Sequence, residues 1–217
     1  MVLRQLRVVV AIFALSCLAF GGQAQSSIKL KRRQLTPGIS MLVPVDFQPM
    51  SDDFLAQKYA YFRKPTVMLS DPYGNIDLGV NITEKYWPQE DIPLLKDIYK
   101  ATLAALYTQI HFHKEAVEQI KRRTYVILEF DAILADEEDE KSAIGVSKPP
   151  VKRYYYMMYT VVDNRIVVFN FNAPIHEKVR WQPIADKIMH SVKLKNIQLP
   201  VEKAPEPDVP PTPPVSR

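Results

Sequence analysis

The chain has 217 residues, with 28 Lys or Arg against 24 Asp or Glu and a formal net charge of +4 at pH 7. Charges so nearly balanced argue against a dedicated nucleic-acid-binding protein, because such domains concentrate basic residues on one face. The six glycines are scattered, which excludes a glycine-rich phosphate-binding loop.

The first 24 residues have the pattern of a secretory signal peptide. Arg4 and Arg7 give a positively charged start, residues 8–20 are apolar, and residues 21–24 form a small-residue cleavage site. A membrane-spanning helix needs roughly 20 apolar residues, so we expect the segment to be removed rather than to stay as an anchor. The mature protein is therefore expected in the periplasm or outside the cell. Removing two of the 28 basic residues leaves 26 against 24 acidic ones, a net charge of +2.

The single cysteine, Cys17, lies inside this segment. Cleavage after Ala24 would leave a mature chain with no thiol and therefore no disulfide. The alternative is a lipoprotein signal in which Cys17 is lipidated, and only then do we expect the protein to be attached to a membrane. Against lipidation, the position three before Cys17 is Ala14 rather than the usual leucine, and apolar residues follow the cysteine.

The first half of the remaining chain alternates between strand and helix periodicity. Charges along its first strand are typical of an edge strand protected against aggregation, and Ser51 is a good N-cap for a helix. In chain order we expect strands at 28–35 and 39–44, a helix at 51–60, a hairpin of 66–70 with 76–83, and a long helix at 89–109.

The second half is rich in strands and ends in an amphipathic helix. Asp163 and Asn164 predict a two-residue hairpin turn, because both tolerate positive φ. The acidic residues 136–140 are expected at a loop tip. In chain order we expect strands at 124–134, 153–162 and 165–173, and a helix at 179–193. The sum is an α+β domain, an antiparallel sheet with helices packed on one face.

Composition changes again after Leu199. Residues 200–217 contain seven prolines and no aromatic residue, so this segment cannot bury enough apolar surface to fold. We expect a disordered proline-rich tail; a spacer or a ligand for an aromatic groove is the functional alternative. Residues 25–199 then form one domain of ordinary size.

The order of these elements resembles the PsbP/DcrB/Mog-type fold, in a bacterial exported member. The resemblance covers roughly residues 28–195 and includes the Pro-x-Asp-Phe loop at Pro44, Asp46 and Phe47. It also includes the stretch 163–194, where a strand leads into a helix beginning with Trp181. The resemblance implies an accessory or adaptor protein, since members include photosystem subunits, envelope proteins, Ran-binding factors and secretion chaperones. It carries over no active site. The proline-rich tail and the missing twin-arginine transit signal depart from the photosynthetic branch.

Alternation in residues 153–162 sends Tyr154 and Tyr156 to one sheet face, and Tyr155 and Tyr159 to the other. Because helices on one face would leave the second face open, some of these tyrosines are expected to be exposed, as on protein-binding surfaces. The alternative is that tyrosine is simply favoured in strands. The candidate partner-binding residues are Tyr154, Tyr156, Met158, Asn170 and Asn172.

His111 and His113 would share one side of a strand, where they would suit a transition metal. No third ligand is evident, and Glu115 only continues the alternation; two solvent-exposed histidines are the alternative reading. The chain has no Gly-x-Ser-x-Gly and no His-Glu-x-x-His. We therefore expect a protein with no enzymatic activity and no cofactor.

The predicted function is that of an exported accessory or adaptor protein that binds another component of the cell envelope or of a secretion system. The alternative is a periplasmic carrier for a small ligand or a metal, which would need an enclosed cavity. The sequence leaves the oligomeric state open.

Overall fold

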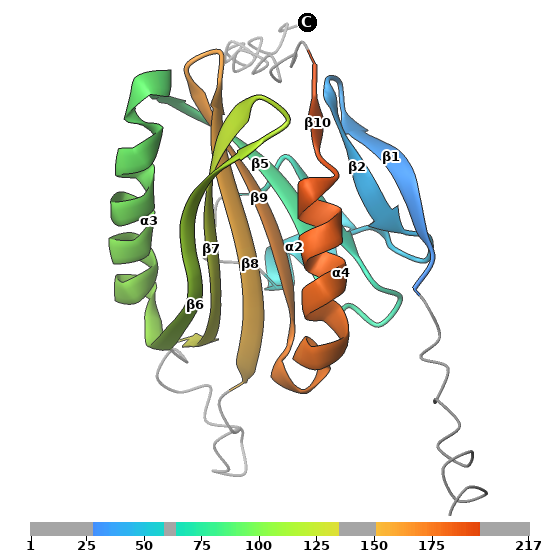
Figure 1. Ribbon diagram of the computed structural model, residues 1–217. Coiled ribbons are helices and arrows are strands. Elements are labelled where there is room, and N and C mark those ends of the chain that lie inside the picture. Colours follow the sequence, from blue (N-terminus) through green and yellow to red (C-terminus); the bar gives the residue numbers. More distant parts are fainter. Residues whose placement is uncertain (1–27, 59–63, 135–150, 196–217) are drawn as a thin grey trace, which may run out of the picture.

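The computed structural model describes residues 28–58, 64–134 and 151–195 (Figure 1). The predicted signal peptide with Cys17, the acidic residues 136–140 and the predicted tail at 200–217 lie outside the described residues. Within the described ranges, no helix has the length and apolar character needed to cross a membrane.

The described residues form two antiparallel sheets. The large sheet has seven strands in the order β3-β4-β5-β9-β8-β7-β6, and the small sheet has the order β1-β2-β10 (Figure 1). The large-sheet strands are β3 (Gln48–Pro49), β4 (Val67–Ser70), β5 (Asp77–Tyr86), β6 (Tyr107–Ile120), β7 (Arg123–Leu134), β8 (Lys152–Val162) and β9 (Arg165–Pro174). The small-sheet strands are β1 (Leu30–Thr36), β2 (Ile39–Pro44) and β10 (Lys193–Leu194).

Two tight turns set the register of the large sheet. Asp163 and Asn164, with φ of 50° and 59°, join β8 to β9, which confirms the predicted hairpin. Lys121 and Arg122, with φ of 49° and 69°, join β6 to β7 in the same way. Two successive positive φ angles match the right-handed twist of the flanking strands.

In the part of the chain that the structure describes, three α-helices cover the large sheet on both faces. These are α2 (Asp52–Lys58), α3 (Ile92–Leu106) and α4 (Lys178–His190), and the 3-10 turns Gln89–Asp91 and Ile175–Glu177 precede α3 and α4. The α+β class is confirmed. The expectation that the helices share one face is wrong, because α4 and the small sheet cover one face while α3 packs on the other. Both sets of alternating residues in β8 are largely apolar, so each face has to be buried.

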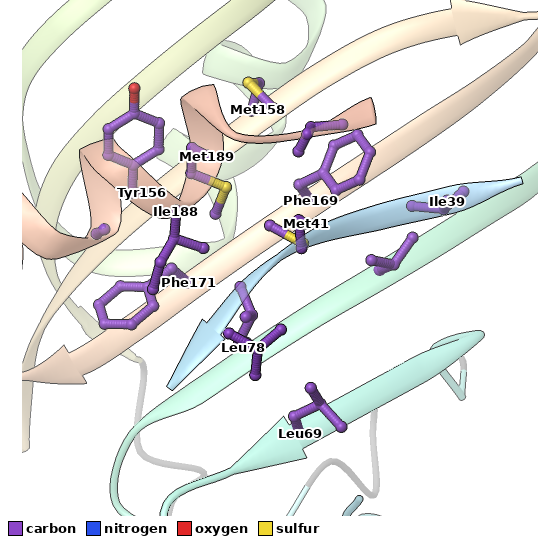
Figure 2. Close-up of a cluster of buried hydrophobic side chains, with 14 of the residues drawn as sticks. Ile39, Met41, Leu69, Leu78, Tyr156, Met158, Phe169, Phe171, Ile188 and Met189 are labelled. Atoms are coloured by element: carbon purple, nitrogen blue, oxygen red, sulfur yellow. The ribbon is translucent and has the colours of Figure 1, made fainter. Parts of the chain in front are cut away.

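The larger core lies between the large sheet, the small sheet and α4 (Figure 2). Trp181 of α4 lies beside Phe171 of β9 and Phe47, with ring centroids 5.6 Å and 5.8 Å apart. Other members are Ile39, Met41, Leu69, Leu78, Tyr156, Met158, Phe169, Ile188 and Met189. The predicted amphipathic helix thus packs as its periodicity indicated.

The second core lies under α3. Its helix side consists of Ile92, Leu95 and Leu103, which pack on strands β7 and β8. Tyr99 of α3 stacks on Tyr159 of β8 with ring centroids 4.1 Å apart. Pro93 is tolerated because it occupies the first turn of the helix.

Strand β6 is the main element that the sequence did not predict. The expected helix at 89–109 ends at Leu106, and Tyr107 already has the extended conformation, with φ −101° and ψ 139°. From there β6 forms an edge of the large sheet. The pairing with β7 shifts register between Phe112 and Lys114, so His113 lies at a bulge.

Candidate protein-binding surface

The structure does not expose the predicted tyrosine surface. Tyr154, Tyr156 and Met158 are fully buried beneath α4, so the prediction of an exposed surface at these residues is wrong. The Tyr154 hydroxyl donates to Glu129 Oε1 at 3.1 Å, and the Tyr156 hydroxyl donates to Asp186 Oδ1 at 3.3 Å. Burial, followed by these carboxylates, raises the pKa of both tyrosines. They act as core residues whose polar tips reach the border of α4.

Asn170 and Asn172 lie on the face of the sheet opposite the larger core. They alternate along β9 with Phe169 and Phe171, whose side chains belong to that core. Asn170 is half-buried opposite Gly79, where an added Cβ would lie 2.2 Å from the Asn170 Oδ1 atom. Asn172 is buried. The five predicted residues therefore do not form one surface, because strand alternation separates them.

His111 and His113 do come together, with ring centroids 4.7 Å apart. The His113 Nε2 atom lies 2.9 Å from Asp131 Oδ2, and Lys178 Nζ approaches both groups, at 2.7 Å from His113 Nε2 and 2.9 Å from Asp131 Oδ1. Among the residues that the structure describes, no three metal-ligand side chains are grouped as a metal site. The Lys178 ammonium serves as the cation for this carboxylate.

Ion pairs continue along the border between α4 and the edge strands. Burial opposes ionisation of Asp131, but hydrogen bonds from Lys178 and His113 outweigh it and hold its pKa below the usual range. A hydrogen bond from Lys114 likewise lowers the pKa of Glu118, whose carboxylate also lies 3.7 Å from His190 Nε2. These contacts fasten α4 to β6 and β7.

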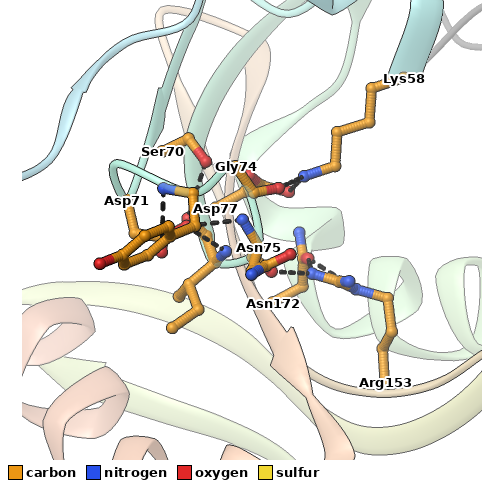
Figure 3. Close-up of polar contacts among 10 residues, drawn as sticks. Lys58, Ser70, Asp71, Gly74, Asn75, Asp77, Arg153 and Asn172 are labelled. Carbon is orange, nitrogen blue, oxygen red and sulfur yellow. Dashed lines mark hydrogen bonds and ion pairs between the residues drawn. The ribbon is translucent and has the colours of Figure 1, made fainter.

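Several hydrogen bonds hold the turn between β4 and β5, residues 71–77, which we call the braced turn (Figure 3). The Asp71 carboxylate accepts hydrogen bonds from the backbone N–H groups of Asn75 at 2.6 Å and Ile76 at 2.8 Å. Gly74 has φ 69°, and its N–H donates to the Asp71 carbonyl at 3.0 Å. Such a side-chain cap fixes the backbone of the turn.

Side chains from outside the turn hold it as well. Lys58, at the end of α2, donates to the Gly74 carbonyl at 2.6 Å and to Asp77 Oδ2 at 2.7 Å. Ser70 donates from Oγ to Asp77 Oδ1 at 2.8 Å. Asp77 is fully buried, so these partners compensate a carboxylate that would otherwise be very unfavourable there.

A third contact that holds the turn comes from β8, an interior strand of the large sheet. Arg153 of β8 donates to the Asn75 carbonyl and to Oδ1 of Asn172 on β9 (Figure 3). Asn172 was predicted as a partner-binding residue. In the structure its side chain instead accepts a hydrogen bond from Arg153, the residue that contacts the turn. Lys58 and Arg153 were missed, because no local pattern links residues that are 16 and 78 positions from their turn partners.

The braced turn displays one large side chain to solvent. Tyr73 is 84% exposed, the joint highest value among the exposed large hydrophobic residues of the described chain. On the inner side of the turn, Phe54 of α2 packs against Gly74, where an added Cβ would lie 2.8 Å from its Cζ atom. An aromatic ring on a backbone held by several elements has the properties of an interface anchor.

Solved structures that align with the chain include proteins from three different organisms. Cyanobacterial PsbP (CyanoP) from Synechocystis sp. PCC 6803 aligns with a TM-score of 0.54 and 12% identity, over 82% of this chain and 99% of that chain. LpqN, involved in cell envelope biogenesis of Mycobacterium tuberculosis, aligns with a TM-score of 0.48 and 13% identity, over 77% and 91%. The Saccharomyces cerevisiae Ran-binding protein Mog1p aligns with a TM-score of 0.44 and 11% identity, over 77% and 96%.

The similarity to CyanoP confirms the fold that the sequence resembles, and at 12% identity it concerns the fold alone. No protein-family model and no curated protein sequence matches the chain. The candidate surface therefore has to be judged by its own geometry.

Proposed function

We propose that this protein, a chain with the PsbP/Mog1-like fold, is an exported accessory protein that binds another protein of the cell envelope and catalyses no reaction. The signal-peptide pattern of residues 1–24 supports export. The observation that carries the binding function is the braced turn with its outward tyrosine.

Rigid display reduces the free energy lost on binding. A mobile surface loop has to be ordered when a partner binds, whereas the turn at 71–77 is already fixed by Asp71, Lys58 and Arg153. Tyrosine also loses little conformational entropy for the area that it buries, which is why it is common at binding hot spots. The braced turn therefore combines a preformed backbone with a suitable anchor.

A purely structural role for the same contacts makes a different prediction. If the braces serve only to compensate the buried Asp77, the exposed Tyr73 ring is dispensable for every function. For the metal-binding alternative, the described ranges contain no group of three His, Cys, Asp or Glu side chains that could hold a metal ion.

The test is capture of envelope proteins with the tagged full-length chain after mild detergent solubilisation. We expect Tyr73→Ala to lose a specific partner that the unmodified protein retains. Tyr86→Ala is the matched control, because Tyr86 is 71% exposed but lies at the end of β5, outside the braced turn. Equal capture by all three proteins would contradict the proposal.

A further inference from the structure

Helix α3 is apolar on its solvent side as well as on its buried side. Ile92, Leu95 and Leu103 face the sheet. On the other side lies a row of exposed apolar residues that we call the outer seam, in which Leu94 is 51% and Ile98 is 42% exposed. The outer seam consists of Leu94, Ile98, Ala101 and Ala105, all of them exposed. A helix that is apolar on opposite sides is typical of one covered from both sides.

The spacing of the outer seam fits another helix. Its members follow one another at intervals of four, three and four residues, which is the heptad spacing of the contact line between two paired helices. No charged residue interrupts this line. A partner helix of similar length can therefore lie along it.

The sizes of the seam residues indicate which helix that is. Two large side chains, Leu94 and Ile98, occupy the N-terminal half, and two small ones, Ala101 and Ala105, occupy the C-terminal half. In an antiparallel pair of identical helices, one register places Leu94 opposite Ala105 and, at the same time, Ile98 opposite Ala101. Large residues then meet small ones at every contact. A parallel pair would place the large residues against each other at one end and the alanines against each other at the other end, so the two ends would require different spacings between the helices.

We propose that the outer seam is the contact of a homodimer in which the α3 helices of two copies pack antiparallel about a two-fold axis. A self-complementary patch of this kind is what a two-fold symmetric interface requires. The inference goes beyond the proposed function, and it uses α3 rather than the braced turn, so a dimer leaves Tyr73 free to bind a partner.

The flanking charges are compatible with this arrangement. Lys96, Asp97 and Lys100 lie on one flank of α3, the flank on which Lys100 Nζ reaches Glu115 of β6 at 2.7 Å. Antiparallel pairing brings the same flank of both helices together. Each Asp97 then meets lysines of the other copy rather than a second row of carboxylates, which favours the pair.

The size of the contact sets the expected affinity. A helix of 15 residues is about 22 Å long, so the helix pair lies at the small end of stable protein interfaces. We expect a dissociation constant on the order of micromolar. The dimer should therefore form and dissociate within an accessible concentration range.

The experiment exchanges the large and small residues of one contact. Sedimentation velocity of the full-length protein, from about 1 µM to about 100 µM, measures the dimer constant. Ile98→Ala creates a small–small contact and Ala101→Ile a large–large contact, and each is expected to weaken the dimer by about tenfold or more. The double variant Ile98→Ala/Ala101→Ile restores large against small, so it should regain the original constant.

Leu106→Ala is the matched control, because Leu106 is an exposed leucine of the same helix outside the outer seam; it should leave the constant unchanged. Circular dichroism of each variant verifies folding, and the exposed positions make all of them compatible with the fold. A protein that is monomeric at every concentration would overturn the proposal. The outer seam would then have to be covered by a different protein. A dimer indifferent to the single variants, or not rescued by the double variant, would also overturn it. Capture through Tyr73 is unaffected by either result, so the two proposals fail separately.

Discussion

The Nζ atom of Lys58 lies 2.7 Å from Oδ2 of Asp77, a fully buried carboxylate 19 positions further along the chain. This ion pair joins the end of α2 to the start of β5 and closes the braced turn from one side. Because the carboxylate has no access to water, it depends on its protein partners for stabilisation.

Replacing Lys58 by methionine should therefore destabilise the protein strongly. Removing one partner of a buried ion pair leaves the other charge uncompensated, and we expect the free energy of unfolding to fall by about 3 kcal/mol. Urea denaturation followed by circular dichroism measures the change. Lys64→Met is the control, since Lys64 pairs at 2.9 Å with the exposed Asp52, and it should change the stability by less than about 1 kcal/mol. Equal effects of the two substitutions would contradict this account of the brace.

Substitution of Gly74 tests the backbone of the turn. Its φ of 69° is unfavourable for residues with a Cβ atom, and that Cβ would press on the Phe54 ring. We expect Gly74→Ala to lower the free energy of unfolding by about 1–2 kcal/mol. Tyr73→Ala, at the neighbouring exposed position, should change it by less than about 0.5 kcal/mol. A stable Gly74→Ala protein would mean that the turn is free to relax.

The border of α4 should make the protein sensitive to acid. Burial opposes ionisation of Asp131, but hydrogen bonds from Lys178 and His113 hold its pKa in the folded state below the ordinary value of an aspartate. The ionised carboxylate therefore contributes stability above the pKa of the unfolded chain, and this contribution is lost as pH falls through the folded pKa.

We accordingly expect the free energy of unfolding of the unmodified protein to decrease below about pH 4. Asp131→Asn should be less stable at pH 7, where Lys178 loses its carboxylate, and should show a smaller decrease in acid. Urea denaturation at a series of pH values measures both effects. An asparagine variant with the same acid dependence as the unmodified protein would show that Asp131 is not the responsible group.

Alkaline pH should act through the buried tyrosines. Burial and nearby carboxylates raise the pKa of Tyr154 and Tyr156 above the ordinary value of a tyrosine. The folded state therefore holds these protons more strongly than the unfolded state does, and the stability is lost as pH rises above the unfolded pKa.

Ultraviolet titration should accordingly show two groups of tyrosines, with Tyr154 and Tyr156 ionising only as the protein unfolds. The double variant Tyr154→Phe/Tyr156→Phe should lack the late absorbance change of these two rings. An unchanged late transition in that variant would assign it to other tyrosines.

Local patterns were sufficient for most secondary structure. The expected strand at 39–44 coincides with β2, and the two-residue turn at Asp163 and Asn164 was predicted from side chains that tolerate positive φ. The closing helix was expected at 179–193 and spans Lys178–His190. In these elements, periodicity and turn chemistry point to the same structure.

Failures arose where tertiary packing decides. The end of α3 was placed too late and β6 was missed, because apolar residues of the helix run directly into an edge strand whose outward residues are polar. Successive residues of β8 point to opposite faces of the sheet, and both series, such as the one with Tyr154 and the one with Tyr155, are largely apolar. This pattern already indicated a sheet that is covered by other elements on both faces. The hydrogen bonds that Lys58 and Arg153 donate to the turn could not be predicted from the sequence, because these residues are far from the turn along the chain.

The position of β10 affects when the protein can fold. This strand consists of Lys193 and Leu194 and pairs with Ser40 and Ile39 of β2. The preceding turn is held by Arg32 of β1, whose guanidinium donates to the Ser191 carbonyl at 3.1 Å. The earliest strands of the domain thus need its last described residues as partners. Chain synthesis proceeds from the N-terminus, so the small sheet stays incomplete until almost the whole domain has been made. The order of the chain therefore places the completion of this sheet at the end of synthesis of the domain.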